Sequence, residues 1–205
     1  MAVIASSVAR KALLSFAVLA LIGGCAPTFE ARVARFSALP APAGQSFVIQ
    51  PRDAANAGGL EFGTYANLVR QRLLATGMTE AATPAAASLT VLLDYTVGPP
   101  REKVQTRPGL GGGFGGFGGG FGGPDIYSVT QYNTTLAMKI ERTSDKASVF
   151  EGRAETVSST NNLTQLVPNL VTAIFTNFPG NSGETVRVKF DPSQPAKPPT
   201  IKPVR

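Results

Sequence analysis

Apolar and polar side chains alternate over several short stretches of the chain, which is typical of strands that bury one face. The clearest is Ser88–Val97, where every second residue from Leu89 to Val97 is apolar. The same alternation predicts strands at Phe29–Phe36, Ser46–Gln50, Tyr127–Arg142, Val149–Val157 and Glu184–Phe190. In the first of these, Phe29, Ala31 and Val33 are expected to face inward.

Two longer stretches repeat apolar residues with the spacing of one helix face. Leu60–Met78 carries Phe62, Ala66, Val69 and Leu73 at that spacing, and Gly77 suits the C-terminal cap. Leu163–Phe178 is the second predicted helix, with Pro168 expected near its first turn or at a kink.

The elements therefore follow the order ββαβ–ββαβ along the chain. Two helices that cover one face of a mostly antiparallel sheet are the simplest way to bury this pattern. The expected fold class is α+β, with two layers and a sheet of about six strands. Residues 25–190 are expected to form this single domain.

Two segments of unusual composition lie outside the predicted elements. Residues 109–123 read GLGGGFGGFGGGFGG, and glycine at this density predicts a flexible loop. Its large side chains include Phe114, Phe117 and Phe121, which either rest on the domain surface or contact a partner or a bilayer. Residues 191–205 contain five prolines without apolar periodicity, which predicts a disordered tail.

The N-terminus has the pattern of a secretory signal peptide. Arg10 and Lys11 precede the apolar run Ala12–Ile22, which is followed by Gly23 and Gly24. The run has 11 residues, whereas a membrane-spanning helix needs about 20. Residues 1–24 are therefore predicted to be a cleaved signal peptide.

The end of this segment, Leu21 to Cys25, reads LIGGC and resembles the lipobox of bacterial lipoproteins. The resemblance implies cleavage after Gly24 and lipid attachment to the sulfur of Cys25. An ordinary signal peptide followed by a chance cysteine is the alternative. Residue 26 is alanine and not the aspartate associated with inner-membrane retention, so we expect an anchor in the outer membrane, on its periplasmic face.

Composition removes several classes of function. The chain has no histidine and one cysteine, which excludes histidine-based catalysis, zinc sites of cysteine and histidine, and an internal disulfide. We predict no enzyme activity, no catalytic residue, no cofactor and no metal site. The net charge is +6, and because Arg10 and Lys11 precede Cys25 it falls to a mild +4 for the chain from Cys25 onward. A secreted chain is also a poor candidate for nucleic-acid binding.

Three further stretches resemble the DUF4136 family of bacterial envelope lipoproteins. They are LLATGM followed by SLTVLLDY, the strand FEGRAETVSS, and the helix end IFTNFPG. In that family the second stretch has the form W-x-G-x-A, with Phe150 here in place of tryptophan, and the third ends in Phe-Pro. The resemblance covers roughly residues 29–190 and implies no catalytic residues.

We therefore expect a lipid-anchored periplasmic protein without catalytic activity, which acts through protein contacts in envelope assembly or maintenance. The protein is expected to contact the membrane through the lipid anchor. An exposed sheet edge is a candidate site for a protein partner. The alternative is a lipid- or glycolipid-binding accessory lipoprotein of an envelope transport system. A deep apolar pocket between the helices and the sheet would favour lipid binding. A filled core with a bare sheet edge would favour protein contacts.

Overall fold

The computed structural model describes residues 28–107 and 125–204 of the 205-residue chain. The predicted signal peptide, Cys25, the glycine-rich segment and its Phe114, Phe117 and Phe121 lie outside the described residues. Among those that are described, no helix has the length and apolar character needed to cross a membrane.

The elements have the following bounds. The strands are β1 (Phe29–Ser37), β2 (Ser46–Pro51), β3 (Thr79–Glu80), β4 (Leu89–Val97), β5 (Arg101–Arg107), β6 (Asp125–Arg142), β7 (Ser148–Ser158), β8 (Glu184–Phe190) and β9 (Thr200–Pro203). The helices are α2 (Leu60–Ala75) and α3 (Leu163–Phe175), and η1 (Ala54–Asn56) and η2 (Pro84–Ala86) are 3-10 turns.

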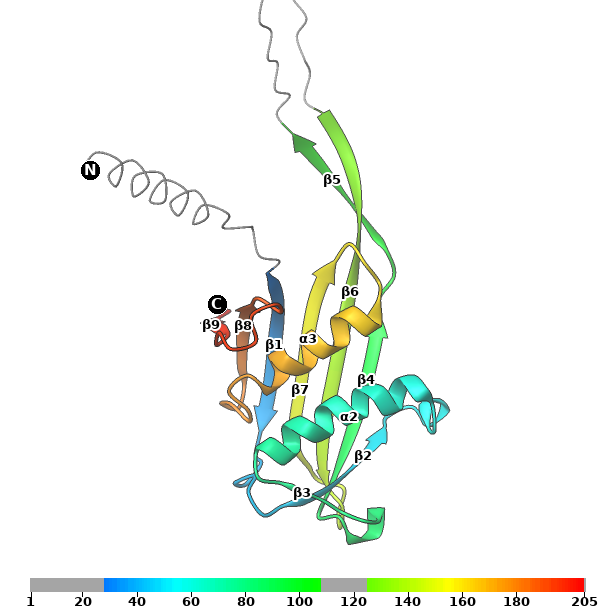
Figure 1. Ribbon diagram of the computed structural model, residues 1–205, viewed down its shortest axis with the longest axis vertical. Helices are drawn as coiled ribbons and strands as arrows, with labels where there is room; N and C mark the ends of the chain where they lie inside the picture. Colours follow the sequence, from blue (N-terminus) through cyan, green and yellow to red (C-terminus); the bar gives the residue numbers. More distant parts are fainter. Residues whose placement is uncertain (1–27, 108–124, 205) are drawn as a thin grey trace, which may run out of the picture.

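The sheet has the strand order β3-β2-β4-β6-β7-β1-β8-β9, and β5 pairs with β6 outside this path. β2 runs parallel to β3 and β4, and the other pairs are antiparallel. Both helices cross the same face of the sheet (Figure 1). The prediction of an α+β fold with two helices on a mostly antiparallel sheet is confirmed.

The sheet has nine strands over the described residues, so the prediction of about six is wrong. The three additional strands are β3, β5 and β9. β3 has only two residues, and β5 reads REKVQTR, so neither shows an apolar alternation. Strands of this kind form through backbone hydrogen bonds to a neighbour, and their side chains give no periodic signal.

β9 also corrects the prediction of a disordered tail over residues 191–205. It pairs with β8, with Ile201 opposite Val188, and all four of its residues are exposed. The turn before it is closed by the carboxylate of Asp191, which accepts from the backbone N–H of Ser193 at 2.9 Å. An edge strand needs no buried side chain, which is why proline-rich composition concealed it.

The space between the helices and the sheet is filled by apolar side chains. The inward faces predicted for the strands are confirmed for Leu89, Val91 and Leu93 on β4 and for Leu136, Met138 and Ile140 on β6. α2 contributes Tyr65, Ala66, Val69 and Leu73, and ends before Gly77, whose φ is +88°. α3 contributes six buried residues and contains Pro168 in its interior.

The hairpin of β5 and β6 extends beyond the body of the sheet as a two-stranded arm (Figure 1). β7 pairs with β6 only from Tyr132 onward, whereas β5 pairs with residues 125–131. β5 follows β4 on the same edge of β6, since the Gly98 N–H donates to the Asn133 carbonyl between the two ladders. Within the described residues, no strand pairs with the other edge of the arm half of β6.

Candidate interaction surfaces

The face of the sheet opposite the helices carries a shallow hollow of about 480 Å³. The register places Ala34, Arg153, Ala137 and Asp94 in one row across β1, β7, β6 and β4. The two alanines lower the floor of the hollow. Its lining is completed by Phe36, Arg52, Leu92, Thr96, Thr135, Met138, Lys139, Glu151 and Gly152.

The rim of this hollow alternates in charge and holds one large apolar group. Arg153 pairs with Glu155 at 2.7 Å, and Lys139 pairs with Glu141 at 2.7 Å, so both cations are held along their own strands. The side chain of Phe36 is 63% exposed at the edge of the hollow. An exposed aromatic ring beside a small depression with charges of both signs is suited to protein contact.

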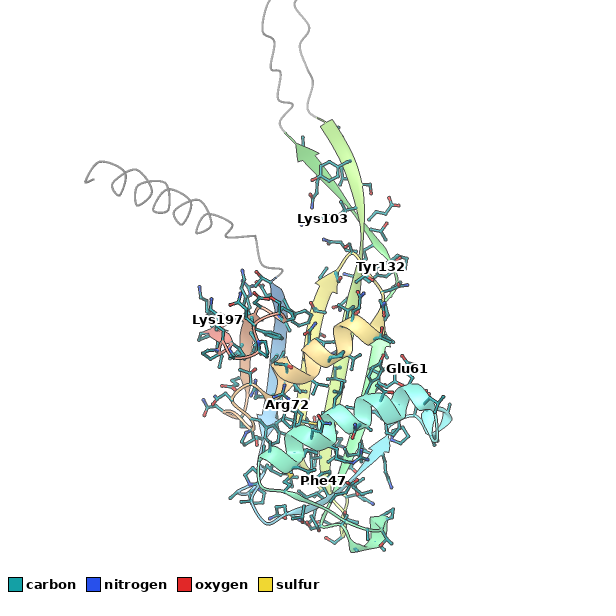
Figure 2. All side chains as sticks on the ribbon, in the orientation of Figure 1. Phe47, Glu61, Arg72, Lys103, Tyr132 and Lys197 are labelled. Carbon is teal, nitrogen blue, oxygen red and sulfur yellow. The ribbon has the colours of Figure 1, made fainter. Side chains whose placement is uncertain are left out.

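A second hollow of about 370 Å³ lies between α2, α3 and the turn after β8. Its wall includes Arg72, whose Nη2 donates to Thr172 Oγ1 at 3.1 Å, and Lys197. Figure 2 shows Arg72 on α2 and Lys197 near the C-terminal turn. The remaining lining mixes the rings of Phe175 and Phe190 with proline, amide and hydroxyl groups, so this hollow combines apolar and polar surface.

Arg35 is a buried charge that alternation alone did not single out. Its side chain is 1% exposed, and its Nε lies 3.3 Å from Glu184 Oε1. Nη1 donates to the carbonyls of Thr176 and Asn177 at 3.1 and 3.2 Å. Burial lowers the pKa of Arg35, and the charge of Glu184 opposes this shift. Arg35 thus ties β1 to the connection between α3 and β8, and it is a structural group with no exposed face.

The sequence contained a signal for this residue. Phe29, Ala31, Val33 and Arg35 have the same parity on β1, so an arginine continues the row of inward-facing residues. A charged residue on the buried side of a strand predicts a buried partner of opposite charge. The partner, Glu184, lies far away in sequence and could not be named from the pattern.

The segments that resemble DUF4136 pack against one another. Phe150 of β7 contacts Phe178 with ring centroids 4.9 Å apart, which joins the FEGRA strand to the Phe-Pro step. At Gly152, a Cβ would lie 2.7 Å from the Phe150 ring and 3.0 Å from Ile174. At Gly180, with φ of +74°, a Cβ would lie 2.5 Å from Arg35 Cδ. Glycine is therefore required at positions 152 and 180, because a side chain there would collide with Phe150 or Arg35.

A family profile described as "Domain of unknown function (DUF4136)" matches residues 34–180. This chain belongs to the DUF4136 family. The resemblance inferred from the three motifs is confirmed, and the matched range ends at Gly180, the glycine beside Arg35. The sequence of this DUF4136 protein matches no protein of curated function.

Some solved structures are similar to this DUF4136 protein at low sequence identity. A PDZ domain protein from Parabacteroides distasonis superposes with a TM-score of 0.50 and 12% identity, over 85% of this chain and 41% of that one. The DUF4136 chain thus spans about two fifths of that protein. A PelC dodecamer from Paraburkholderia phytofirmans gives a TM-score of 0.40 and 12% identity, over 70% of this chain and 94% of that one.

Ionisable groups inside the domain serve packing. The hydroxyl of Tyr65 donates to Glu61 Oε1 at 3.0 Å, and its ring meets Tyr95 edge-on with centroids 4.8 Å apart. Burial raises the pKa of Tyr65, and the hydrogen bond to Glu61 raises it further. Burial also raises the pKa of Tyr95. Within residues 28–107 and 125–204, no three acidic, cysteine or histidine side chains are grouped so that they could hold a metal ion.

None of the site residues predicted from sequence lies in the described ranges. Cys25 precedes the first described residue, and Phe114, Phe117 and Phe121 fall in the sequence gap between residues 107 and 125. The structure instead shows apolar side chains on the arm itself, where Val104 is 66% and Ile126 is 71% exposed. Sequence reasoning missed both. Val104 is a single apolar residue in a polar stretch, and Ile126 lies just before the strand predicted from Tyr127 onward.

Proposed function

We propose that this DUF4136 protein is a lipid-anchored protein of the periplasmic face of the outer membrane. It acts without catalysis, through protein contacts in envelope assembly or maintenance. The observation that carries this proposal is the face of the sheet that no described element covers, with the exposed ring of Phe36 beside the hollow around Ala34 and Ala137.

The state of the core supports protein contacts over the lipid-binding alternative. The apolar side chains between the helices and the sheet form one buried cluster, in which Val69, Leu73, Leu136, Leu170 and Ile174 are all 0% exposed. An acyl chain needs a deep apolar cavity, and both hollows instead lie on the outside of the domain and carry charged groups.

The chemistry of the hollow indicates what kind of protein surface would fit. One apolar side chain of a partner would pack on Ala34, Ala137 and Phe36. The surrounding charges would select orientation, because Asp94 and Glu151 favour cations while Arg52 and Arg153 favour anions. Apolar contact at the centre and charge at the rim is the common anatomy of a protein interface.

In-cell photocrosslinking tests the proposed surface. A photoreactive amino acid replaces Phe36 in the full chain, and the control replaces Leu74, which is 45% exposed on α2 in the helical layer. We expect a discrete protein adduct from position 36 that is lost when Ala137→Arg fills the hollow. Equal adducts from both positions, or none from position 36, would contradict a contact on this face.

The lipid-binding alternative makes a different prediction, which can be tested on the purified chain. The purified chain would carry a stoichiometric amount of extractable lipid besides the lipid on Cys25, and mass spectrometry of the extract would detect it.

The anchor is tested by Cys25→Ser, which we expect to release the protein from the membrane fraction. A variant that pellets with membranes to the same extent as the wild type would disprove the anchor.

A further inference from the structure

The start of the domain and the β5–β6 arm lie at the same end of the sheet. β1 and β6 are both antiparallel to β7, so their N-terminal ends point in one direction. Figure 1 shows the arm rising past the level at which β1 begins. Any attachment that holds the N-terminus to a surface therefore brings the arm toward that surface.

The register shows how far the arm reaches. Arg32 of β1, Glu155 of β7 and Thr135 of β6 form one row across the sheet. Phe29 lies three residues before Arg32, whereas Ile126 lies nine residues before Thr135. The arm thus extends six residues beyond the start of β1, which is about 20 Å at the rise of an antiparallel strand.

The predicted tether is shorter than this reach. Cys25 is four residues before Phe29, and four residues span at most about 14 Å when fully extended. If the strands stand upright on the membrane, the arm tip reaches slightly past the level of Cys25. If the sheet tilts, the arm lies along the surface.

The opposite orientation conflicts with the length of the tether. With the arm pointing away from the membrane, the nine-residue strand β1 would stand between its own N-terminus and the bilayer. That strand is about 30 Å long, so a tether of about 14 Å would not reach past it. Lipid attachment at Cys25 therefore excludes an arm that points straight away from the membrane.

The arm carries a surface that suits the membrane interface. Pairing of Thr106 with Ile126 and of Val104 with Ser128 puts Val104 and Ile126 on one face as diagonal neighbours. Both are more than half exposed, and Lys103 lies on the opposite face (Figure 2). The charged residues of β5 favour the interface over the hydrocarbon core, where a charged side chain is costly.

Cations gather beside the start of β1 as well. Arg187, Lys189 and Lys202 lie on β8 and β9, where Lys189 is opposite Glu30 and Lys202 is opposite Arg187. Glu30 pairs with Arg187 at 3.1 Å, so the two lysines remain available to anionic headgroups. Lys197 lies at the same end of the domain (Figure 2). Positive charge close to an anionic surface is attracted to it.

We propose that the β5–β6 arm is a second membrane contact, which places Val104 and Ile126 at the interface of the bilayer that holds Cys25. This inference rests on the lipid anchor of the proposed function. Together, the anchor and the arm fix the orientation of the domain, with the β6–β7 turn directed into the periplasm and the uncovered sheet face accessible from the side.

Depth measurements on the lipidated full chain test this orientation. A sulfur in thioether linkage does not react with maleimides, so an Ile126→Cys variant offers one free thiol for an environment-sensitive fluorophore. The matched control is Ser144→Cys, in the turn at the far end of β6. Both are reconstituted in vesicles of phosphatidylethanolamine and phosphatidylglycerol, with and without spin-labelled lipid.

We expect a blue-shifted emission and strong quenching by spin-labelled lipid at position 126, and neither at position 144. A label at position 126 that stays accessible to aqueous iodide in a lipidated, vesicle-bound chain would overturn the arm contact alone. Two reactive thiols per chain, with failure to bind vesicles, would show that Cys25 carries no lipid and would overturn both proposals.

Discussion

The two halves of β6 share a strand but differ in almost every other respect. From Tyr132 to Arg142 the strand lies between β4 and β7, and Leu136, Met138 and Ile140 are buried beneath the helices. From Ile126 to Gln131 its described partner is β5, and Ile126 is 71% exposed. Burial in this domain therefore depends on what covers a strand and not on the strand itself.

This difference separates stability from interaction. Side chains in the body half hold the two layers together, so changes there act on the free energy of unfolding. Side chains in the arm half contact little of the domain, so changes there act on whatever the arm touches. Four predictions follow this division, from the largest expected effect on stability to the smallest.

Arg35→Met should have the largest effect, because it breaks the one charged contact in the body of the domain that is almost fully buried. It leaves Glu184 and the carbonyls of Thr176 and Asn177 without their donor. Loss of one partner from a buried ion pair costs about 3–5 kcal/mol. Urea unfolding of the soluble domain measures the change.

The control for this prediction is the double variant Arg35→Met/Glu184→Gln, which removes both charges. It should recover part of the loss, because no unpaired carboxylate remains. If Arg35→Met were as stable as the wild type, the guanidinium would contribute nothing. The connection between α3 and β8 would then be held by its other contacts, such as the Phe150–Phe178 ring pair and the Gly183 N–H that donates to the Arg35 carbonyl.

Leu136→Ala should come next. Leu136 is 0% exposed in the centre of the body half, between Ala154 on β7 and Tyr95 on β4. A buried leucine replaced by alanine costs about 3 kcal/mol, including the cavity it leaves. The neighbouring position provides the control, since Ala137→Ser faces the uncovered side and should change the urea midpoint little.

Tyr65→Phe should have an intermediate effect that depends on pH. At neutral pH it removes the hydrogen bond to Glu61 and costs about 1 kcal/mol. The folded-state pKa of Tyr65 is raised by burial, so the unfolded chain loses the phenolic proton first. This stabilisation is present below the ordinary tyrosine pKa and is lost as the pH rises above it.

The wild type should therefore lose stability steeply at alkaline pH, and Tyr65→Phe should lose less. Tyr95 has a raised pKa for the same reason and will retain part of the slope in the variant. Urea midpoints measured across the alkaline range compare the two proteins. Parallel curves would show that Tyr65 does not ionise differently in the folded and unfolded states.

The body of the domain could be predicted from sequence because its pattern is periodic. Residues Glu184–Phe190 formed the predicted strand with the same bounds, and both helices began where predicted. Helix ends were predicted too late, since Gly77 and Asn177 take left-handed conformations that stop α2 and α3 earlier. The alternation reports burial, so it works wherever a strand has one covered face.

The same reasoning explains what could not be predicted. β5 and β9 have no covered face, so their side chains carry no alternation and only the pairing reveals them. The partnership of Arg35 with Glu184 depends on topology, because β1 and β8 lie side by side although they are distant in sequence. The pairing of the strands was likewise needed to show that the arm and the start of β1 point in the same direction.

The smallest effect on stability is expected for the arm variant Val104→Ser/Ile126→Ser. Both side chains are mostly exposed, and such surface changes alter the free energy of unfolding by at most about 0.5 kcal/mol. The same substitutions should weaken vesicle binding of the non-lipidated Cys25→Ser chain, because two apolar groups no longer enter the interface. Flotation assays on vesicles compare this arm variant with the body variant Leu136→Ala, both in the Cys25→Ser chain. The body variant should lose stability and keep its membrane affinity, and the arm variant should do the reverse. A large loss of stability in the arm variant would mean that Val104 and Ile126 pack against the chain itself, and the distinction between the two halves of β6 would then fail.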